Sequence, residues 1–373
     1  PYEKNCKAHW INENDPMPED FSFQLYNDDL ERLEWYIDDA CKRVPLLGSV
    51  GIKRVVNGPI PYAPDGLPLI GPMPGVPNAF EACVFTFGIV QAGGAGKLLS
   101  EIIIEGESET DSWAVDPRRF TDHVDEKYSI AKAIETYSHE YAMHFPQIQW
   151  SAGRPSKKSP LYETLISNGA VMGSYGGWER ADWFTKNDLL KKPACSYDKQ
   201  HWFDSVGNEC KNVMENCGII DLTGFSRFEV KGKGSSKWLE SLITGNLPKI
   251  GKIGLVYFSS PKGKVLTEMT ATCIEEDHYW LLSGAGAYWH DRDWLNINLP
   301  DNCDFKISDN TYKTGTLLVT GPNAESLLSK LASIPLDKDN FPWLSTKELF
   351  INHIKCRFLR VSYSGENGFE IHV

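Results

Sequence analysis

Residues 84–106 read VFTFGIVQAGGAGKLLSEIIIEG. The apolar run Val84–Val90 predicts a buried strand, and the glycine-rich residues 92–96 predict a tight turn. From Ala95 onward apolar residues recur at helical spacing, which predicts an amphipathic helix. A strand, a glycine turn and a helix N-terminus together present backbone N–H groups to an anionic or carbonyl-rich ligand. The alternative is an ordinary strand-to-helix turn, and these residues alone do not decide between the two.

The segment upstream of this stretch predicts one helix and one strand. Residues 28–44 have an acidic start and a basic end, the order that the helix dipole favours. Residues 52–57 (IKRVVN) are typical of a strand. Residues 58–72 hold too many prolines for a helix or a central strand, and Asp65-Gly66 within them predicts a turn.

The segment downstream alternates between helical and strand patterns. Residues 146–160 are rich in Pro, Ser, Gly and Lys and predict a linker, and residues 176–184 predict an aromatic-rich loop. Helices are expected at 126–141, 161–166, 202–216, 235–243, 290–295 and 324–331. Strands are expected at 225–231, 254–259, 265–272, 279–283, 316–320, 358–362 and 369–373, with 260–264 as a hairpin connection. The second half is therefore α+β.

Composition limits the class of protein. A chain of 373 residues predicts two or three domains, and a net charge of −12 argues against nucleic acid as a partner. No apolar run is long enough for a membrane span. Nine cysteines, with no CxxC pair, are typical of a reducing compartment and argue against a zinc site, so we expect no metal. The chain starts at Pro1 and stops inside FEIHV, so we expect a fragment of a longer polypeptide.

Several motifs are absent. The sequence contains no G-x-G-x-x-G dinucleotide fingerprint, no phosphate-binding GxxxxGK[ST], no GxSxG and no HExxH. The residues by themselves therefore describe an acidic intracellular α/β protein with one glycine-rich stretch suited to a ligand.

Three blocks in order nevertheless resemble a known family. DGLPLIG (65–71) with FGIVQAGGAGKLLSEII (87–103) resembles the C-terminal half of a D-amino-acid-oxidase-type flavin domain. WAVDPRRF, AGRPSKKSPLYETL and GGWERADWF resemble the bridging segment of dimethylglycine and sarcosine dehydrogenases. CGIIDLTGFSRFEVKG, PKGKVLTEMTAT, YWHDRDW and VSYSGENGFEIHV are similar to the folate-binding domain that those enzymes share with the glycine-cleavage aminomethyltransferase.

The resemblance implies a multidomain α+β and α/β fold. Residues 1–112 would be the C-terminal portion of an FAD-dependent oxidoreductase domain, 113–170 a bridging segment, and 171–373 the N-terminal portion of an aminomethyltransferase-like folate-binding domain. It also implies FAD and tetrahydrofolate as cofactors. The implied reaction is oxidative N-demethylation of dimethylglycine or sarcosine, with one-carbon transfer to tetrahydrofolate.

The resemblance implies flavin contacts in the glycine-rich stretch. There, backbone N–H groups and the positive end of the helix would stabilise negative charge on the reduced flavin. Gln91 stands where the family often has His, and Thr86 where it often has Gly. Gln91 can donate a hydrogen bond but cannot titrate as a histidine does. The implied flavin-binding residues are Gly88, Ile89, Val90, Gln91, Ala92, Gly93, Gly94, Ala95 and Gly96.

The resemblance implies folate contacts in the last third of the chain. Glu370 would accept hydrogen bonds from the pterin, with Tyr363 facing the same ring and Ile371 and His372 beside it. Glu268 would be catalytic, orienting the folate amine and carrying its proton. Met269 and Thr270 complete this set. For Glu268 and Glu370 the alternative is a solvent-facing carboxylate on a strand.

Two other motifs are interpreted as structural: His290-Asp291 as a hydrogen bond on a helix, and Trp178-Glu179-Arg180 as packing between domains.

The rival function is a catalytically silent relative, like the regulatory subunit of pyruvate dehydrogenase phosphatase, and a folate-only methyltransferase is disfavoured. Expected partners are the N-methylglycine substrate and an electron acceptor, either electron-transfer flavoprotein or oxygen. The resemblance implies the mitochondrial matrix in a eukaryote and the cytoplasm in a bacterium.

Overall fold

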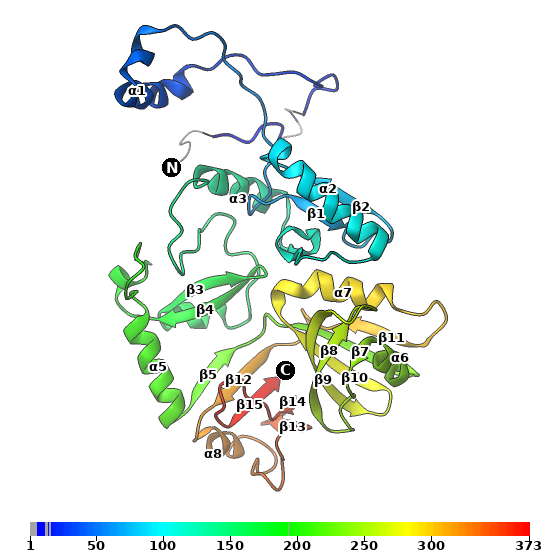
Figure 1. The fold of residues 1–373 in the computed structure, drawn as a ribbon. Coiled ribbons are helices and arrows are strands. Elements are labelled where there is room, and N and C mark those ends of the chain that lie inside the picture. The colour runs from blue at the N-terminus through cyan, green and yellow to red at the C-terminus, as the bar shows by residue number, and fades with distance from the viewer. Residues whose placement is uncertain (1–5, 12–13, 15, 193) are drawn as a thin grey trace. The chain divides into compact units, whose positions relative to one another are not determined.

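The computed structural model describes residues 6–11, 14, 16–192 and 194–373 (Figure 1). The chain forms two compact units, and each is described by itself. Unit 1 comprises residues 1–72, 79–117 and 125–143, and unit 2 comprises residues 73–78, 118–124 and 144–373. Within the described ranges, no helix has both the length and the apolarity that crossing a membrane requires.

Unit 1 is built around a short hairpin and three helices. Strands β1 (Leu69–Pro72) and β2 (Phe80–Cys83) pair antiparallel. The helices are α1 (Glu34–Arg43), α2 (Gly88–Glu105) and α3 (Glu126–Ser138). Helix α3 begins at a side-chain cap, because the Asp125 carboxylate accepts from the backbone N–H of Tyr128 at 2.8 Å. The predicted helices 28–44 and 126–141 are thus confirmed in shortened form, whereas residues 52–57 form no strand.

The glycine-rich stretch is helical, which corrects the prediction of a strand at 84–90 followed by a turn at 92–96. The strand ends at Cys83, Val84 takes a φ of +59°, and α2 then runs without a break from Gly88. Each interior glycine costs a helix about 1 kcal/mol relative to alanine. Burial of Ala95 and Ile102 supports the helix against that cost.

Unit 2 begins with a helix and a hairpin. Helix α4 (Tyr162–Ser167) precedes β3 (Ala170–Tyr175) and β4 (Trp178–Phe184), which pair antiparallel, and α5 (Phe203–Glu215) follows. The prediction of an aromatic-rich loop at 176–184 is therefore wrong. Its Gly176-Gly177 pair makes the hairpin turn, with φ values of +57° and +83°, and the aromatic residues after it are strand residues.

An antiparallel sheet of six strands forms the first core of unit 2, in the order β11-β6-β10-β9-β8-β7. The strands are β6 (Ser226–Lys233), β7 (Ile243–Thr244), β8 (Ile253–Ser259), β9 (Val265–Glu275), β10 (His278–Ser283) and β11 (Asp304–Asp309). Helices α6 (Ser235–Leu242) and α7 (Tyr288–Ile297) supply Leu239 and Leu295, which are fully buried against Phe228 and Phe258. The predicted 254–259 and 265–272 hairpin is confirmed.

A second antiparallel sheet, of five strands in the order β13-β14-β15-β12-β5, carries the second core. The strands are β5 (Gly218–Asp221), β12 (Thr316–Thr320), β13 (Thr346–Ile351), β14 (Ile354–Leu359) and β15 (Gly368–His372), with helix α8 (Ala324–Ser329) against them. Leu328 of α8 packs in one cluster with Phe358 and Phe369. The strand predicted from FEIHV is β15.

Lys157 and Arg154 tie the predicted linker to the rest of unit 2. The Lys157 ammonium lies 2.6 Å from the Asp122 carboxylate and 5.9 Å from the Trp178 ring centroid. The Arg154 guanidinium makes two hydrogen bonds to the buried Glu179 carboxylate, of 2.7 and 2.9 Å. These charge-assisted bonds hold residues 154–157 in place, so this part of the linker is ordered.

Candidate functional site

Strand β9 directs the predicted folate residues to opposite faces of the six-stranded sheet. Glu268 is exposed and Thr270 half-buried on one face, whereas Met269 points into the core with 1% of its surface exposed. The alternation follows from the two-residue period of a strand. The Met269 side chain packs among Phe258 and Leu281, which leaves only backbone atoms of Met269 for the cofactor contact that the resemblance implies.

Strand β15 sorts its residues in the same way. Ile371 belongs to the core cluster of the five-stranded sheet and is 3% exposed, so its side chain is also unavailable to a ligand. Glu370 and His372 alternate with it and lie outside that cluster, although both are buried. Among the predicted folate residues, Met269 and Ile371 are therefore core residues. Glu370 and His372 lie together on the face of β15 opposite to Ile371.

Tyr363 connects the polar residues of the two strands. Partial burial raises the pKa of its phenol, and the charges of Glu370 and Glu268 add to that rise, while a hydrogen bond with Thr270 opposes it. These interactions place the four side chains in one neighbourhood. Tyr363 nevertheless keeps 69% of its surface exposed, so it is accessible to a ligand. The structure brings together Glu268, Thr270, Tyr363 and Glu370.

Glu268 has a partner on the neighbouring strand. It lies opposite Tyr257 in the β8–β9 pairing, and its hydrogen bond raises the pKa of the Tyr257 phenol. A phenol that donates to a carboxylate limits the directions in which that carboxylate can point. Tyr257 is a site residue that the sequence did not indicate.

Glu370 belongs to a chain of buried polar groups. Its Oε2 lies 3.1 Å from His372 Nε2, and His372 Nδ1 lies 2.9 Å from Thr316 Oγ1. Thr316 Oγ1 in turn accepts from the Arg227 guanidinium at 2.5 Å. Neither Thr316 nor Arg227 was predicted. They lie 56 and 145 positions before His372 in the sequence, so only the strand pairing of Thr316 with His372 brings them there.

The candidate flavin residues Gly88–Gly96 form the first turns of α2. The first backbone hydrogen bond of the helix runs from Gln91 N–H to Phe87 O at 3.0 Å, which leaves the N–H groups of residues 88–90 without helical acceptors. The glycines at 93, 94 and 96 are inside the helix, so they make no anion-binding turn. This corrects the predicted geometry and limits the donors at this end to residues 88–90.

Two features of α2 are suited to a flat polar ligand. The Oε1 atom of Gln91 is buried and has no hydrogen-bond partner within the described residues, so it is an acceptor that lacks a donor. A Cβ added at Gly93, Gly94 or Gly96 would meet nothing within 4 Å, so the helix backbone is bare on that side. Ile89 is 98% exposed beside these residues.

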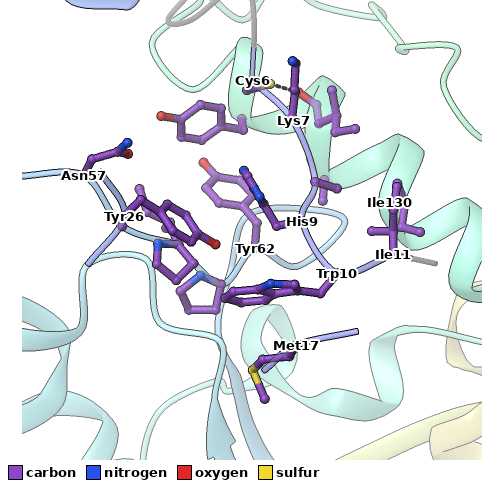
Figure 2. A pocket seen from close by; sticks show the side chains of 18 of the residues that line it. Cys6, Lys7, His9, Trp10, Ile11, Met17, Tyr26, Asn57, Tyr62 and Ile130 are labelled. Atoms are coloured by element: carbon purple, nitrogen blue, oxygen red, sulfur yellow. Dashed lines mark hydrogen bonds between the residues drawn. The ribbon is translucent and has the colours of Figure 1, made fainter. Parts of the chain in front are cut away.

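Unit 1 also contains a cavity that the sequence did not indicate (Figure 2). It has a volume of about 610 Å³ and is lined mainly by aromatic and proline side chains together with residues of α3. The His9 ring stacks on Tyr26 with centroids 4.8 Å apart, and Tyr62 meets Tyr137 edge to face. None of residues 88–96 lines this cavity, so it is distinct from the candidate flavin residues.

Three protein-family models match successive segments of the chain. The model described as GCVT N-terminal domain matches residues 161–373, which is more than half of the chain. The chain belongs to this family. Ahead of its GCVT N-terminal domain, the models for the FAD dependent oxidoreductase central domain and the FAD dependent oxidoreductase match residues 105–159 and 10–102. The predicted fold class, an oxidoreductase portion followed by an aminomethyltransferase-like domain, is confirmed.

Individual relatives of this GCVT N-terminal domain protein agree with that order. Mouse mitochondrial dimethylglycine dehydrogenase is 37% identical over 380 residues, which cover 100% of this chain and 43% of that protein. Human mitochondrial sarcosine dehydrogenase is 27% identical, covering 95% and 43%. The mouse regulatory subunit of pyruvate dehydrogenase phosphatase is 26% identical, covering 100% and 43%. The chain therefore spans less than half the length of these relatives, and its similarity to the first is the greatest of the three.

Proposed function

We propose that the chain is part of an FAD-dependent dehydrogenase that removes an N-methyl group from a methylated glycine and passes the one-carbon unit to tetrahydrofolate. The observation that carries this proposal is the 37% identity to a dimethylglycine dehydrogenase along the whole chain. The three matching domains, in the same order, support it. The candidate substrates are dimethylglycine and sarcosine.

The residues at the start of α2 fit the isoalloxazine of FAD. When bound, FAD supplies the hydride acceptor of the reaction. The N–H groups of residues 88–90 would donate to its carbonyl-rich edge, since the positive end of a helix favours negative charge there. The bare glycine side would admit the flat ring. Ala92 and Ala95 would contribute to the same helix surface through backbone atoms.

The polar groups of β9 and β15 fit the pterin of tetrahydrofolate. A pterin presents several N–H donors on one edge, and among the described residues the Oε1 atom of Glu370 has no hydrogen-bond partner. Tyr363 is exposed close by. We assign Glu268 the catalytic role of orienting the folate amine nitrogen and carrying its proton, with Tyr257 holding its carboxylate. Met269 and Ile371 would contribute only backbone atoms.

Three further assignments belong to the same proposal. The domain division is 1–112, 113–170 and 171–373, and the family matches that end at residues 102 and 159 support its two boundaries. The electron acceptor is electron-transfer flavoprotein or oxygen. The names of the mitochondrial relatives favour the mitochondrial matrix for a eukaryotic source.

The full-length protein tests the proposal. It should show flavin absorbance, reduce an artificial dye when dimethylglycine or sarcosine is added, and release less formaldehyde when tetrahydrofolate is present. Absence of both flavin and amine-driven dye reduction would contradict the proposal and favour the regulatory alternative. That alternative shares the same coverage of the chain, but at 26% identity.

A further inference from the structure

Buried polar groups form a hydrogen-bonded chain that ends at Glu370. The chemistry of each group determines which partner donates and which accepts in each hydrogen bond, and this order is the direction of the chain. It starts at Arg227, which is 3% exposed and lies on β6 of the six-stranded sheet. It crosses to Thr316 on β12 of the five-stranded sheet, continues through His372 and ends at the Glu370 carboxylate. All four residues have 5% or less of their surface exposed, so water does not take the place of a missing partner.

The first link sets the orientation of the threonine hydroxyl. A guanidinium can only donate, so Thr316 Oγ1 accepts from Arg227 and still has its own proton to donate. The other neighbour of that oxygen is His372 Nδ1, at 2.9 Å. The hydroxyl proton therefore points at Nδ1, which must be the unprotonated nitrogen of the ring in order to accept it.

The second link sets the tautomer of the imidazole. With Nδ1 accepting, the neutral ring carries its proton on Nε2, which lies 3.1 Å from Glu370 Oε2 and donates to it. The opposite tautomer would place two acceptors face to face unless Glu370 were protonated. The doubly protonated ring would leave the threonine proton without an acceptor. Only the Nε2–H tautomer gives both ring nitrogens and the threonine hydroxyl a hydrogen-bond partner.

Charges around the ring favour the same neutral form. Burial lowers the pKa of His372, and the positive charges of Arg227 and Arg357 lower it further, while Glu370 opposes them. The Trp280 ring meets the imidazole edge to face with centroids 5.7 Å apart, which leaves the ring little room to turn. The Glu370 carboxylate therefore receives a neutral donor on Oε2.

We propose that His372 is a positioning residue rather than a cofactor contact: with Thr316 and Arg227 it holds the Glu370 carboxylate with Oε2 occupied and Oε1 presented to the N–H donors of a bound pterin. The consequence is selectivity for ligands that offer N–H donors, since a carboxylate oxygen accepts hydrogen bonds and does not donate them. This inference rests on the proposed folate site for its ligand, but the direction of the chain does not depend on that ligand.

Nuclear magnetic resonance of the imidazole nitrogens in the 373-residue chain tests the direction without any ligand. Comparison with His372→Gln identifies the signals of His372 among those of the nine histidines. We expect a protonated Nε2 and a bare Nδ1 at pH 7. In Thr316→Val the Nε2–H form should remain, because Glu370 still accepts from it, but the Nδ1 signal should shift to that of a ring nitrogen with no hydrogen bond. Thr320→Val removes a hydroxyl from the same strand outside the chain and should leave the Nδ1 signal unchanged. A protonated Nδ1 at pH 7 in the unsubstituted chain would overturn the inference.

Titration of the same proteins with 5-formyltetrahydrofolate tests the consequence for binding. Thr316→Val should weaken folate binding about tenfold, because loss of the Thr316 hydroxyl loosens His372 and with it the hydrogen bond that positions the Glu370 carboxylate. Thr316→Ser and Thr320→Val should stay within about twofold of the unsubstituted chain. Equal affinities for Thr316→Val and Thr316→Ser would overturn the positioning role. Absence of folate binding in the unsubstituted chain, with the expected tautomer present, would instead contradict the proposed function alone.

Discussion

His372 Nε2 lies 3.1 Å from Oε2 of Glu370, two residues earlier on the same strand. Residues i and i+2 of a strand point to the same face, so strand geometry alone makes this contact available. The contact uses one carboxylate oxygen and leaves the other for a ligand. Glu370 is thus both a buried structural group and the most direct candidate for pterin recognition.

We expect Glu370→Ala in the full-length protein to weaken folate binding by about ten- to a hundredfold, because a charge-assisted hydrogen bond is lost. Amine oxidation should remain largely intact, since it depends on the flavin portion. Calorimetric titration with folate and a dye-reduction assay measure the two properties. Glu240→Ala, an exposed carboxylate on α6, is the matched control. Equal loss of both activities in Glu370→Ala would show that the two sites are not separable.

The Arg154–Glu179 pair should be a major contributor to the stability of unit 2. Glu179 has only 2% of its side chain exposed, so Glu179→Gln would leave the Arg154 charge without its ionic partner in a largely buried place. We expect a loss of about 3–5 kcal/mol in the free energy of unfolding. Lys158 and Glu163 form an exposed pair 3.3 Å apart, so Glu163→Gln should cost less than about 1 kcal/mol. Urea denaturation would measure both, and similar losses would contradict this difference.

His372 should make the chain less stable in mild acid. Its pKa in the folded chain is lowered from 6.5, so the unfolded chain binds a proton first as the pH falls. The stability from burying the neutral ring is therefore present above pH 6.5 and is lost below it, with a slope of up to about 1.4 kcal/mol per pH unit. Denaturation between pH 5 and 8 should show this fall, and His372→Gln should show less of it. An unchanged slope in that variant would assign the effect to other histidines.

Helix α2 should gain stability from substitutions that impair flavin binding. Gly93→Ala adds a methyl group that meets nothing within 4 Å, so it should stabilise the folded chain by about 0.5–1 kcal/mol. Gly106→Ala is the contrast, because Gly106 ends the same helix with a φ of +77° that alanine adopts only with strain. Thermal unfolding should therefore separate the two variants in opposite directions. In the full-length protein, Gly93→Ala should contain less flavin, and unchanged flavin content would remove residue 93 from the proposed site.

Strands of period two were predictable from the sequence. The final FEIHV segment alternates apolar and polar residues, residues 254–259 and 265–272 flank a hairpin-like connection, and each of the three is a strand in the structure. The helices at 235–243 and 324–331 were also found, because their apolar residues share one face. Local pattern was sufficient wherever one face of an element is buried in its own unit.

The glycine-rich stretch and the aromatic hairpin could not be predicted in the same way. In both, tertiary packing outweighs local preference: buried Ala95 and Ile102 support a helix through glycines, and pairing with β3 makes a strand of residues 178–184. The polar chain that ends at Glu370 could not be predicted from local sequence patterns for another reason. Arg227 meets Thr316 across 89 positions, and nothing in either segment indicates the other.

Glu268 and Met269 point to opposite faces of β9, so their environments depend on the register in which β9 pairs with β8. A slip of one residue against β8 would bury the carboxylate of Glu268 in the core and expose the Met269 thioether at the site. Correct pairing is thus a condition of a working site, and a ligand held by Glu268 would selectively stabilise chains that have paired correctly. A folate bound at the proposed site would therefore also favour the correct β8–β9 register.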